Sequence, residues 1–254
     1  MKNYLIDTHA HIDMIDTPIE EMLNDMEING VKKCIIPAVE LKTQEKIINI
    51  ANGYDNIYAM IGLYPSETKN YTDETEEYFT SLAKNKKVIA FGEIGLDYYW
   101  DKTFVDIQKD VFIKQILLAN KLDLPIVVHD REAHKDCFEL LKEYDKNNKV
   151  LFHCFSGSVE FMRECVAQNW MIALGGVVTF KNAKKMKEVA KEIPLDYLVL
   201  ETDSPYLTPV PYRGKTNYPA YVKYVAEEIA KIRGISVDEI VDITTNNAER
   251  FFKI

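Results

Sequence analysis

Short β-branched runs alternate with amphipathic helical patterns along the whole chain, and this alternation limits the folds open to it. Eight such runs occur, each followed by apolar residues at helical spacing. The runs lie at residues 4–6, 33–37, 57–63, 88–94, 125–129, 150–153, 171–174 and 197–201. Helical patterns follow at residues 18–29, 41–51, 75–84, 103–121, 132–144, 158–169, 182–191 and 219–233. The alternation therefore predicts an α/β fold.

Eight strand–helix units in 254 residues predict a TIM-like (β/α)8 barrel, formed as a single domain over residues 1–254. A doubly wound open sheet is the alternative, but a dinucleotide fold of that kind needs a glycine-rich phosphate loop after its first strand, and none occurs there. The capping sequence Ser236-Val237-Asp238-Glu239 opens one further helical pattern. We therefore expect the barrel to carry an extra C-terminal helix.

Composition excludes several classes of protein. The apolar content of 47% is enough for one large core, and the net charge of −9 argues against coating long duplexes through bulk electrostatics. No apolar run approaches the roughly 18 residues of a membrane span. The four cysteines, which show no C-x-x-C spacing, are expected to be reduced: Cys34, Cys137, Cys154 and Cys165. We expect a cytoplasmic monomer that makes no membrane contact and touches nucleic acid only locally.

A pair of histidines follows the first predicted strand, in the segment Ile6-Asp7-Thr8-His9-Ala10-His11. Side chains two positions apart in a strand point the same way, and neutral imidazole is a common metal ligand. Two surface histidines at a strand exit are the alternative for this motif alone. Whether the two histidines bind a metal or lie at the surface depends on which residues stand at the ends of the other strands.

Four later strands also end in metal-ligating side chain types. Glu93 lies in the fourth strand, His129 and His153 end the fifth and sixth, and Asp203 follows the eighth. In a (β/α)8 barrel these strand ends share one rim, and a buried Glu is costly unless it is paired or binds a cation. The sequence therefore predicts one metal centre made of six donors: His9, His11, Glu93, His129, His153 and an acid from the end of the eighth strand, where Glu201 and Asp203 both lie.

Six donors exceed what one tetrahedral catalytic ion with an open position needs. Two divalent ions sharing a bridging carboxylate would use all six, and Glu93 is the expected bridge. The imidazole content suits Zn or Mn at least as well as Mg.

The motifs also resemble those of the TatD family of metal-dependent deoxyribonucleases, in the amidohydrolase-like superfamily. The matching stretches are Asp7-Thr8-His9-Ala10-His11, Gly92-Glu93-Ile94-Gly95-Leu96-Asp97-Tyr98, His129-Asp130-Arg131, His153-Cys154-Phe155-Ser156-Gly157, Glu201-Thr202-Asp203-Ser204-Pro205 and Arg213-Gly214-Lys215. They run in the expected order over essentially the whole chain. The resemblance implies a TIM-barrel hydrolase that removes nucleotides from the 3′ end of single-stranded DNA.

The resemblance also implies roles for the six donors. His9, His11, Glu93 and Asp203 would hold one divalent ion, and Glu93, His129 and His153 would hold the other. Asp203 would in addition be the base that takes a proton from the attacking water, and Glu93 would be the second catalytic carboxylate. A helix-capping Asp before Ser204-Pro205 is the structural alternative for Asp203.

The chain departs from the family pattern at two places. The family has Gly-x-His-Pro after strand three, whereas Tyr64 stands in the His position here. After Lys215 the family continues with a basic residue, Asn, Glu and Pro, whereas this chain has Thr216, Asn217, Tyr218 and Pro219. Both departures lie outside the metal set, so we expect them to affect substrate handling.

The substrate contacts are expected on the loops of the same rim. Arg131, Arg213 and Lys215 are candidates for binding phosphates, with ordinary surface salt bridges as the alternative. Tyr64 is a further candidate, and Tyr98 and its two aromatic neighbours either stack on unpaired bases or pack over the barrel mouth. Two groups are expected to take no part: the lysines at 181, 184, 185 and 187, as a solvated helix face, and Cys154, as a core residue.

A second class of hydrolase remains open at this point. The superfamily also cleaves carboxyl esters and amides, so a D-aminoacyl-tRNA deacylase or a small-molecule amidohydrolase is the alternative function. Many amide-cleaving relatives bridge their ions with a modified Lys on strand four, where this chain has Glu93. That difference favours phosphodiester cleavage. A non-catalytic metal-binding scaffold is disfavoured because the donor set is complete.

Overall fold

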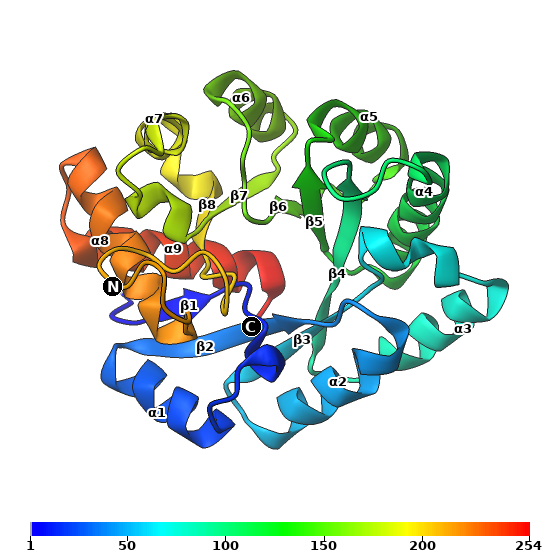
Figure 1. The fold of residues 1–254 in the computed structure, drawn as a ribbon, viewed down its shortest axis with the longest axis horizontal. Coiled ribbons are helices and arrows are strands. Elements are labelled where there is room, and N and C mark those ends of the chain that lie inside the picture. The colour runs from blue at the N-terminus through cyan, green and yellow to red at the C-terminus, as the bar shows by residue number, and fades with distance from the viewer. Residues whose placement is uncertain (1) are drawn as a thin grey trace.

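The computed structural model describes residues 2–254 and folds them into a parallel barrel surrounded by helices (Figure 1). The strands are β1 (Leu5–Asp7), β2 (Val31–Pro37), β3 (Ile57–Ile61), β4 (Val88–Asp97), β5 (Ile126–Arg131), β6 (Val150–Phe152), β7 (Met171–Leu174) and β8 (Leu198–Leu200). They lie side by side in sequence order, and every neighbouring pair is parallel. The predicted (β/α)8 barrel is confirmed.

The helices alternate with the strands, as the sequence pattern predicts. They are α1 (Ile19–Ile28), α2 (Gln44–Gly53), α3 (Asp73–Leu82), α4 (Val105–Leu122), α5 (His134–Tyr144), α6 (Val159–Ala167), α7 (Lys184–Glu192), α8 (Val222–Arg233) and α9 (Val237–Phe252). Pro18 precedes α1 with an extended ψ of 141° and is not its first helical residue, so the helix begins at Ile19 and not at residue 18 as predicted. Across residues 2–254 no helix combines the length and apolar character needed to cross a bilayer.

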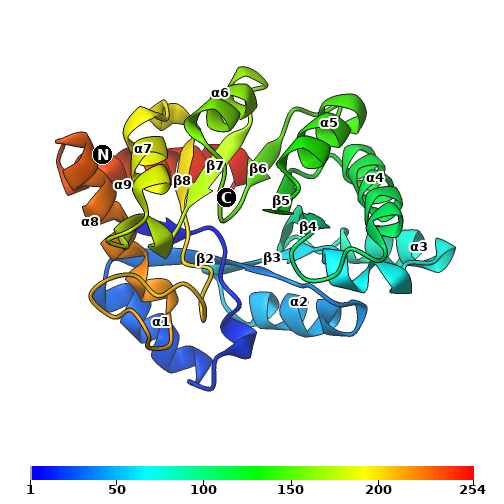
Figure 2. The same ribbon diagram turned by 45° about the horizontal axis from the view of Figure 1, so that its top comes forward.

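The barrel closes just beyond the ends of β1 and β8. The amide of Thr8 donates to the Leu200 carbonyl at 3.1 Å, and the amide of His11 donates to the Ser204 carbonyl at 2.7 Å. The amide of Asp203 donates to the His9 carbonyl at 2.9 Å. In Figure 2 these two segments run near each other, the first in dark blue and the second in yellow to orange. The backbone of three predicted donors is therefore held by the closing seam of the barrel.

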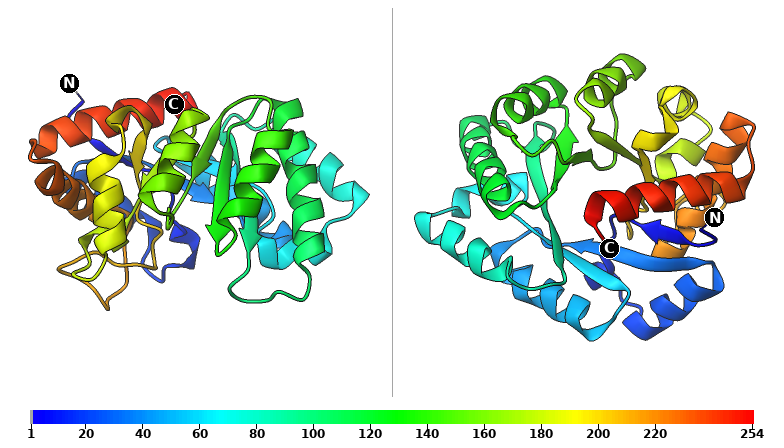
Figure 3. Two further views of the ribbon diagram at one scale, coloured as in Figure 1. Left: turned by 90° about the horizontal axis from the view of Figure 1, so that it is seen from above. Right: turned by 180° about the vertical axis from the view of Figure 1, so that it is seen from behind.

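The inside of the barrel is a packed apolar core, and its N-terminal end is covered by α9. One buried core consists of side chains that the strands point inward, together with two residues of α9: Ile6, Ile35, Met60, Ala90, Val127, Leu151, Met171, Ala173, Val199, Ala248 and Phe252. Viewed from behind, α9 lies across this end of the barrel (Figure 3). Burying a Phe side chain such as Phe252 contributes about 1.5–3 kcal/mol. The extra C-terminal helix therefore closes the end opposite the predicted rim.

An irregularity in β4 aims Glu93 into the barrel mouth. Phe91 pairs with Ile126 and Ile94 pairs with Val128, so three steps along β4 face two along β5. Such a bulge redirects the side chain at the extra position. A Cβ on Gly95 would lie 2.0 Å from the carbonyl oxygen of His129, and the φ of Gly95 is +147°. Glycine is required at this position because the two backbones leave no room for a side chain.

Replacing Gly95 with alanine is expected to lower the free energy of unfolding by more than about 2 kcal/mol, because both the close approach and the positive φ oppose a Cβ. The change is also expected to displace His129. Gly53→Ala is the matched control, since a Cβ there meets nothing within 4 Å. Urea unfolding of both variants measures the difference. Equal unfolding midpoints for the two variants would contradict this account of β4.

Candidate metal centre

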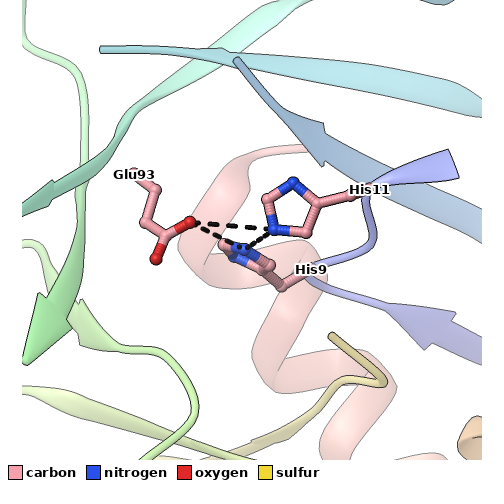
Figure 4. Close-up of side chains that lie close together, drawn as sticks. All are labelled: His9, His11 and Glu93. Carbon is pink, nitrogen blue, oxygen red and sulfur yellow. Dashed lines mark hydrogen bonds and ion pairs between the residues drawn. The ribbon is translucent and has the colours of Figure 1, made fainter. Parts of the chain in front are cut away.

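Glu93 reaches two pairs of imidazoles, one pair with each carboxylate oxygen. Its Oε2 lies 3.4 Å from Nε2 of His9 and 3.8 Å from Nε2 of His11 (Figure 4). Its Oε1 lies 2.6 Å from Nδ1 of His129 and 2.7 Å from Nε2 of His153. This division of its oxygens suits a carboxylate that bridges two cation sites with one oxygen toward each.

Asp203 belongs to the first of these two groups. Its Oδ1 lies 3.5 Å from Nε2 of His11 and 3.9 Å from Nε2 of His9. The Asp203 side chain is 15% exposed, against 4% for Glu93, so it is the more open of the two carboxylates. The structure thus brings together all six predicted donors, from residues in or just after β1, β4, β5, β6 and β8.

The residues present fit divalent cations. Nε2 of His9 and Nε2 of His11 are 3.3 Å apart and face the same carboxylate oxygen, and Nδ1 of His129 and Nε2 of His153 are 3.4 Å apart and face the other. One proton between two such nitrogens can bond to only one of them, whereas a cation can take lone pairs from both. Imidazole and carboxylate donors together suit Zn, Mn or similar ions.

Burial and the close packing of charges set the protonation states of the donors. Burial alone would raise the pKa of Glu93, but the imidazoles of His153, His129 and His9 lower it well below its usual value. Burial, reinforced by the His153 ring, lowers the pKa of His9 to about 4. Ionised Glu93 and neutral His9 are forms that bind a cation. Burial alone would lower the pKa of His129, but the Asp97 and Glu93 carboxylates raise it to about 9, so a bound cation would have to displace a proton from this ring.

Asp97 and Tyr64 hold the His129 ring from behind. Nε2 of His129 lies 3.1 Å from Oδ2 of Asp97, and the Tyr64 hydroxyl donates to the same oxygen at 3.1 Å. A proton shared between Nε2 and Asp97 leaves Nδ1 of His129 free to face Glu93. Burial raises the pKa of Tyr64 far above its usual value, so its hydroxyl stays a donor. Tyr64, which replaces the family His, therefore supports a ligand without being one.

Asp97 was missed as a site residue, although the sequence contains a signal for it. It ends β4 four residues after Glu93, and residues an even number apart in a strand tend to share a face. Asp7 was also missed: its carboxylate accepts hydrogen bonds from the amides of His9 at 3.2 Å and Thr202 at 2.9 Å. Asp7 thereby ties the chain next to His9 to the chain next to Asp203.

A cavity of about 1110 Å³ opens over the donors. Arg131 and Tyr64 line it, as expected for substrate-binding residues. Lys184 and Lys185, expected to be a solvated helix face, line it as well, because the first turn of α7 borders the cavity. Cys154 also lines it and is not in the core: its φ of +43° just after β6 breaks the alternation of faces.

Three predicted substrate-binding residues do not line the cavity. The Tyr98 hydroxyl donates to Asp136 on α5 at 2.7 Å. The Arg213 guanidinium stacks 3.5 Å from the centre of the Phe180 ring, and the Lys215 ammonium lies 5.7 Å from the centre of the Tyr212 ring. These three side chains are held outside the donor cluster by neighbours that the sequence pattern does not reveal.

The second departure from the family pattern lies at an anchor of the loop after β8. Asn217, which keeps the family residue, is fully buried and donates to the carbonyls of Thr202 at 2.9 Å and Tyr206 at 2.6 Å. Tyr218, where the family has Glu, places its hydroxyl 3.1 Å from that of Thr17. The loop is therefore anchored beside Asp203, although the family Glu is absent.

Comparison with known proteins agrees with this geometry. The model of the TatD related DNase family matches residues 6–253. The chain is 46% identical over 253 residues to the uncharacterized metal-dependent hydrolase YabD of Bacillus subtilis, covering 98% of this chain and 99% of that protein. It is 34% identical over 257 residues to the uncharacterized metal-dependent hydrolase YcfH of Escherichia coli, covering 99% and 96%.

Solved structures give the same result. YjjV, a TatD homolog from Escherichia coli, matches with a TM-score of 0.93 at 31% identity and covers 100% of both chains. A TatD family hydrolase from Entamoeba histolytica matches with a TM-score of 0.85 at 26% identity and covers 99% of both chains. The chain described here therefore belongs to the TatD-related DNase family and is a metal-dependent hydrolase.

Proposed function

We propose that the protein is a deoxyribonuclease that removes nucleotides from the 3′ end of single-stranded DNA by means of two divalent ions. His9, His11, Glu93 and Asp203 would hold one ion, and Glu93, His129 and His153 would hold the other. The main support for two ions is the position of Glu93, whose two oxygens face different imidazole pairs. Mg, Mn and Zn all remain compatible with these donors.

When bound, the two ions supply a nucleophilic water at neutral pH and offset the charge that develops on the phosphoryl oxygens. Asp203 is the residue we assign to take the proton of the attacking water. Burial alone would raise its pKa, but the His11 ring lowers it below the usual value, so Asp203 is ionised at neutral pH. Glu93 is less suited to this role because it is nearly buried and both of its oxygens face imidazoles.

Cationic side chains near the donors support a phosphate-bearing substrate. Arg131 lines the cavity, and its guanidinium lies 3.8 Å from the centre of the Tyr99 ring and 5.3 Å from that of Trp100. Lys184 and Lys185 line the same cavity. In a protein of net charge −9, these cations offer the local contact with phosphate that the overall charge does not.

Exposed aromatic rings at the cavity support an unpaired strand as substrate. Trp100 is 72% exposed and Tyr206 is 55% exposed, and both line the cavity. The Tyr206 ring lies 6.3 Å from that of His11, centre to centre. Bases stack on such rings when they are not already stacked in a duplex. The exposed rings of Trp100 and Tyr206 therefore favour single-stranded over double-stranded DNA as the substrate.

The test is a parallel assay of metal-loaded protein on four substrates: 5′-labelled single-stranded DNA, duplex DNA, RNA and D-aminoacyl-tRNA. We expect the single-stranded DNA to be shortened from its 3′ end, giving a ladder of labelled products. Release of the labelled 5′ nucleotide as the first product would contradict the proposed polarity. Faster cleavage of the tRNA ester than of any nucleic-acid backbone would move the protein to the alternative hydrolase class.

Removing the metal is expected to stop the reaction. Treatment with EDTA should reduce turnover to background, because the six donors cannot by themselves supply the charge compensation that the two ions give. Adding excess Zn²⁺ or Mn²⁺ after dialysis should restore it. Undiminished activity in EDTA, in protein shown by mass spectrometry to be metal-free, would rule out the metal mechanism.

A further inference from the structure

A second buried carboxylate, Glu201, lies beside His153. The Glu201 side chain is 0% exposed, and its Oε1 accepts a hydrogen bond from the Cys154 amide at 2.5 Å. Its Oε2 lies 3.8 Å from Nδ1 of His153, and neither of these two atoms has a hydrogen-bond partner among residues 2–254. A buried polar atom without a hydrogen-bond partner destabilises the folded protein. The position of Oε2 of Glu201 opposite Nδ1 of His153 therefore needs an explanation.

The explanation follows from the protons that His153 can carry. A neutral imidazole carries one proton, and a nitrogen that coordinates a cation carries none. Nε2 of His153 faces Oε1 of Glu93 at 2.7 Å and Nδ1 of His129 at 3.4 Å, which is where the proposed cation would be held. With a cation there, the single proton of His153 is on Nδ1. The acceptor that faces Nδ1 is Oε2 of Glu201.

A similar but closer arrangement, within hydrogen-bond distance, occurs at His129 with the two nitrogens exchanged. His129 faces Glu93 with Nδ1, and its Nε2 lies 3.1 Å from Asp97. His153 faces Glu93 with Nε2, and its Nδ1 faces Glu201. In each ring a carboxylate lies next to the nitrogen that is turned away from Glu93. A carboxylate at that position selects which nitrogen keeps the proton.

We propose that Glu201 is a positioning residue for the metal centre: with a cation bound, Oε2 closes from its 3.8 Å separation into hydrogen-bond range of Nδ1 of His153, accepts the Nδ1–H and so keeps Nε2 unprotonated toward Glu93. This inference rests on the proposed role of His153 as a metal ligand, and it does not depend on DNA being the substrate. Donor atoms of His9, His153 and Glu201 also lie within 4.8 Å of one another. Nε2 of His153 already coordinates the proposed cation, so a second cation on Nδ1 would require the ring to lose both of its protons. We therefore assign a proton, and not a cation, to the space between Nδ1 of His153 and Oε2 of Glu201.

The test is the isosteric variant Glu201→Gln. The amide oxygen of Gln can still accept from the Cys154 amide, but its NH2 group then faces Nδ1 of His153 as a donor. The proton of His153 is thereby moved to Nε2, where it competes with the cation. Titration calorimetry of the metal-free variant with Zn²⁺ should show two binding events, one of them weakened about 10–100-fold. The ion held by His9, His11 and Asp203 should bind nearly as in the wild type.

Two control variants accompany it. Asp97→Asn should weaken the same binding event through His129, because it exchanges an acceptor for a donor at Nε2. Glu160→Gln, the same type of substitution at an exposed position on α6, should leave both Zn²⁺-binding events unchanged. A Glu201→Gln variant that folds and binds both ions with wild-type affinity would overturn the inference. Gln keeps the shape of Glu201 and its hydrogen bond to the Cys154 amide, so this result would leave Glu201 with a structural role only.

A measurement on the wild-type protein keeps the inference testable if Glu201→Gln does not fold. Imidazole ¹⁵N spectra of the Zn²⁺-loaded protein should show the His153 proton on Nδ1. A proton on Nε2, or a third Zn²⁺ bound per wild-type chain, would overturn the assignment of a proton to this position. Failure of the proposed metal centre would look different, because the wild type itself would bind no Zn²⁺. Failure of the proposed deoxyribonuclease activity alone would leave all of these Zn²⁺ measurements unchanged.

Discussion

Replacing Glu93 with alanine is expected to reduce hydrolysis by about a thousandfold or more while the barrel remains folded. Both Glu93 oxygens face imidazole pairs, so the change removes one donor from each proposed ion at once. His129 and His153 then keep no carboxylate from the donor set, and His9 and His11 keep only Asp203 to compensate the charge of a divalent ion. Of the six donors, Glu93 is the one whose loss affects both sites directly.

Three measurements check this expectation. Turnover on single-stranded DNA at saturating Zn²⁺ gives the activity, mass spectrometry after dialysis gives the ions per chain, and circular dichroism reports the fold. The control is Glu139→Gln, an exposed change on α5 that should leave all three unchanged. A folded Glu93→Ala protein that retains both ions and more than a tenth of the wild-type turnover would remove Glu93 from the bridging position.

Asp203→Asn is expected to lower kcat by about 10²–10⁴-fold with little change in KM. Asn keeps the shape of Asp and one oxygen near His11, but it cannot take up a proton from the attacking water. The substrate contacts at Arg131 and at the exposed aromatic rings are untouched by this change. The loss should therefore fall on the chemical step.

Counting the bound ions separates the two roles of Asp203. If Asp203→Asn retains the wild-type number of ions and loses kcat, Asp203 acts as the base. If it loses an ion together with kcat, and added Zn²⁺ restores the activity, Asp203 is a ligand only. Wild-type turnover in this variant would exclude Asp203 as the base. Asp203→Ala removes both functions and sets the lower limit for comparison.

Most of the barrel was predictable because its signals are local. Strand and helix periodicities are properties of a few consecutive residues, and the predicted units correspond to β1–β8 and the helices between them. Errors occurred where pairing across strands overrides local preference. β4 continues past Ile94 to Asp97 because Leu96 and Asp97 still pair with Asp130 and Arg131 of β5.

The convergence of the six donors was predictable from one rule of topology. Parallel strands of a barrel end at one rim, so side chains at five strand ends meet there without regard to their distance in sequence. The rule does not give orientation. Glu93 faces both imidazole pairs because of the bulge in β4, and Cys154 faces the cavity because of its positive φ.

The supporting residues and the substrate contacts could not be predicted with the same success. Asp97 and Glu201 lie in or next to strands that carry donors, but no pattern in the sequence shows which imidazole nitrogen each of them faces. Tyr98, Arg213 and Lys215 lie on loops, where side-chain direction depends on packing partners far away in the chain. Helical periodicity predicts a solvated face for Lys184 and Lys185. It does not show that the first turn of α7 borders the cavity.

The order of strands and helices and the types of side chain at each strand end can be read from the amino-acid sequence, since both follow from short-range periodicity and the geometry of parallel strands. The oxygen of Glu93 that faces each imidazole pair, and the nitrogen of His129 and His153 that faces Glu93, depend on the folded chain. The reason is physical: such orientations arise from a bulge, a barrel seam and buried hydrogen bonds between residues that are distant in the chain.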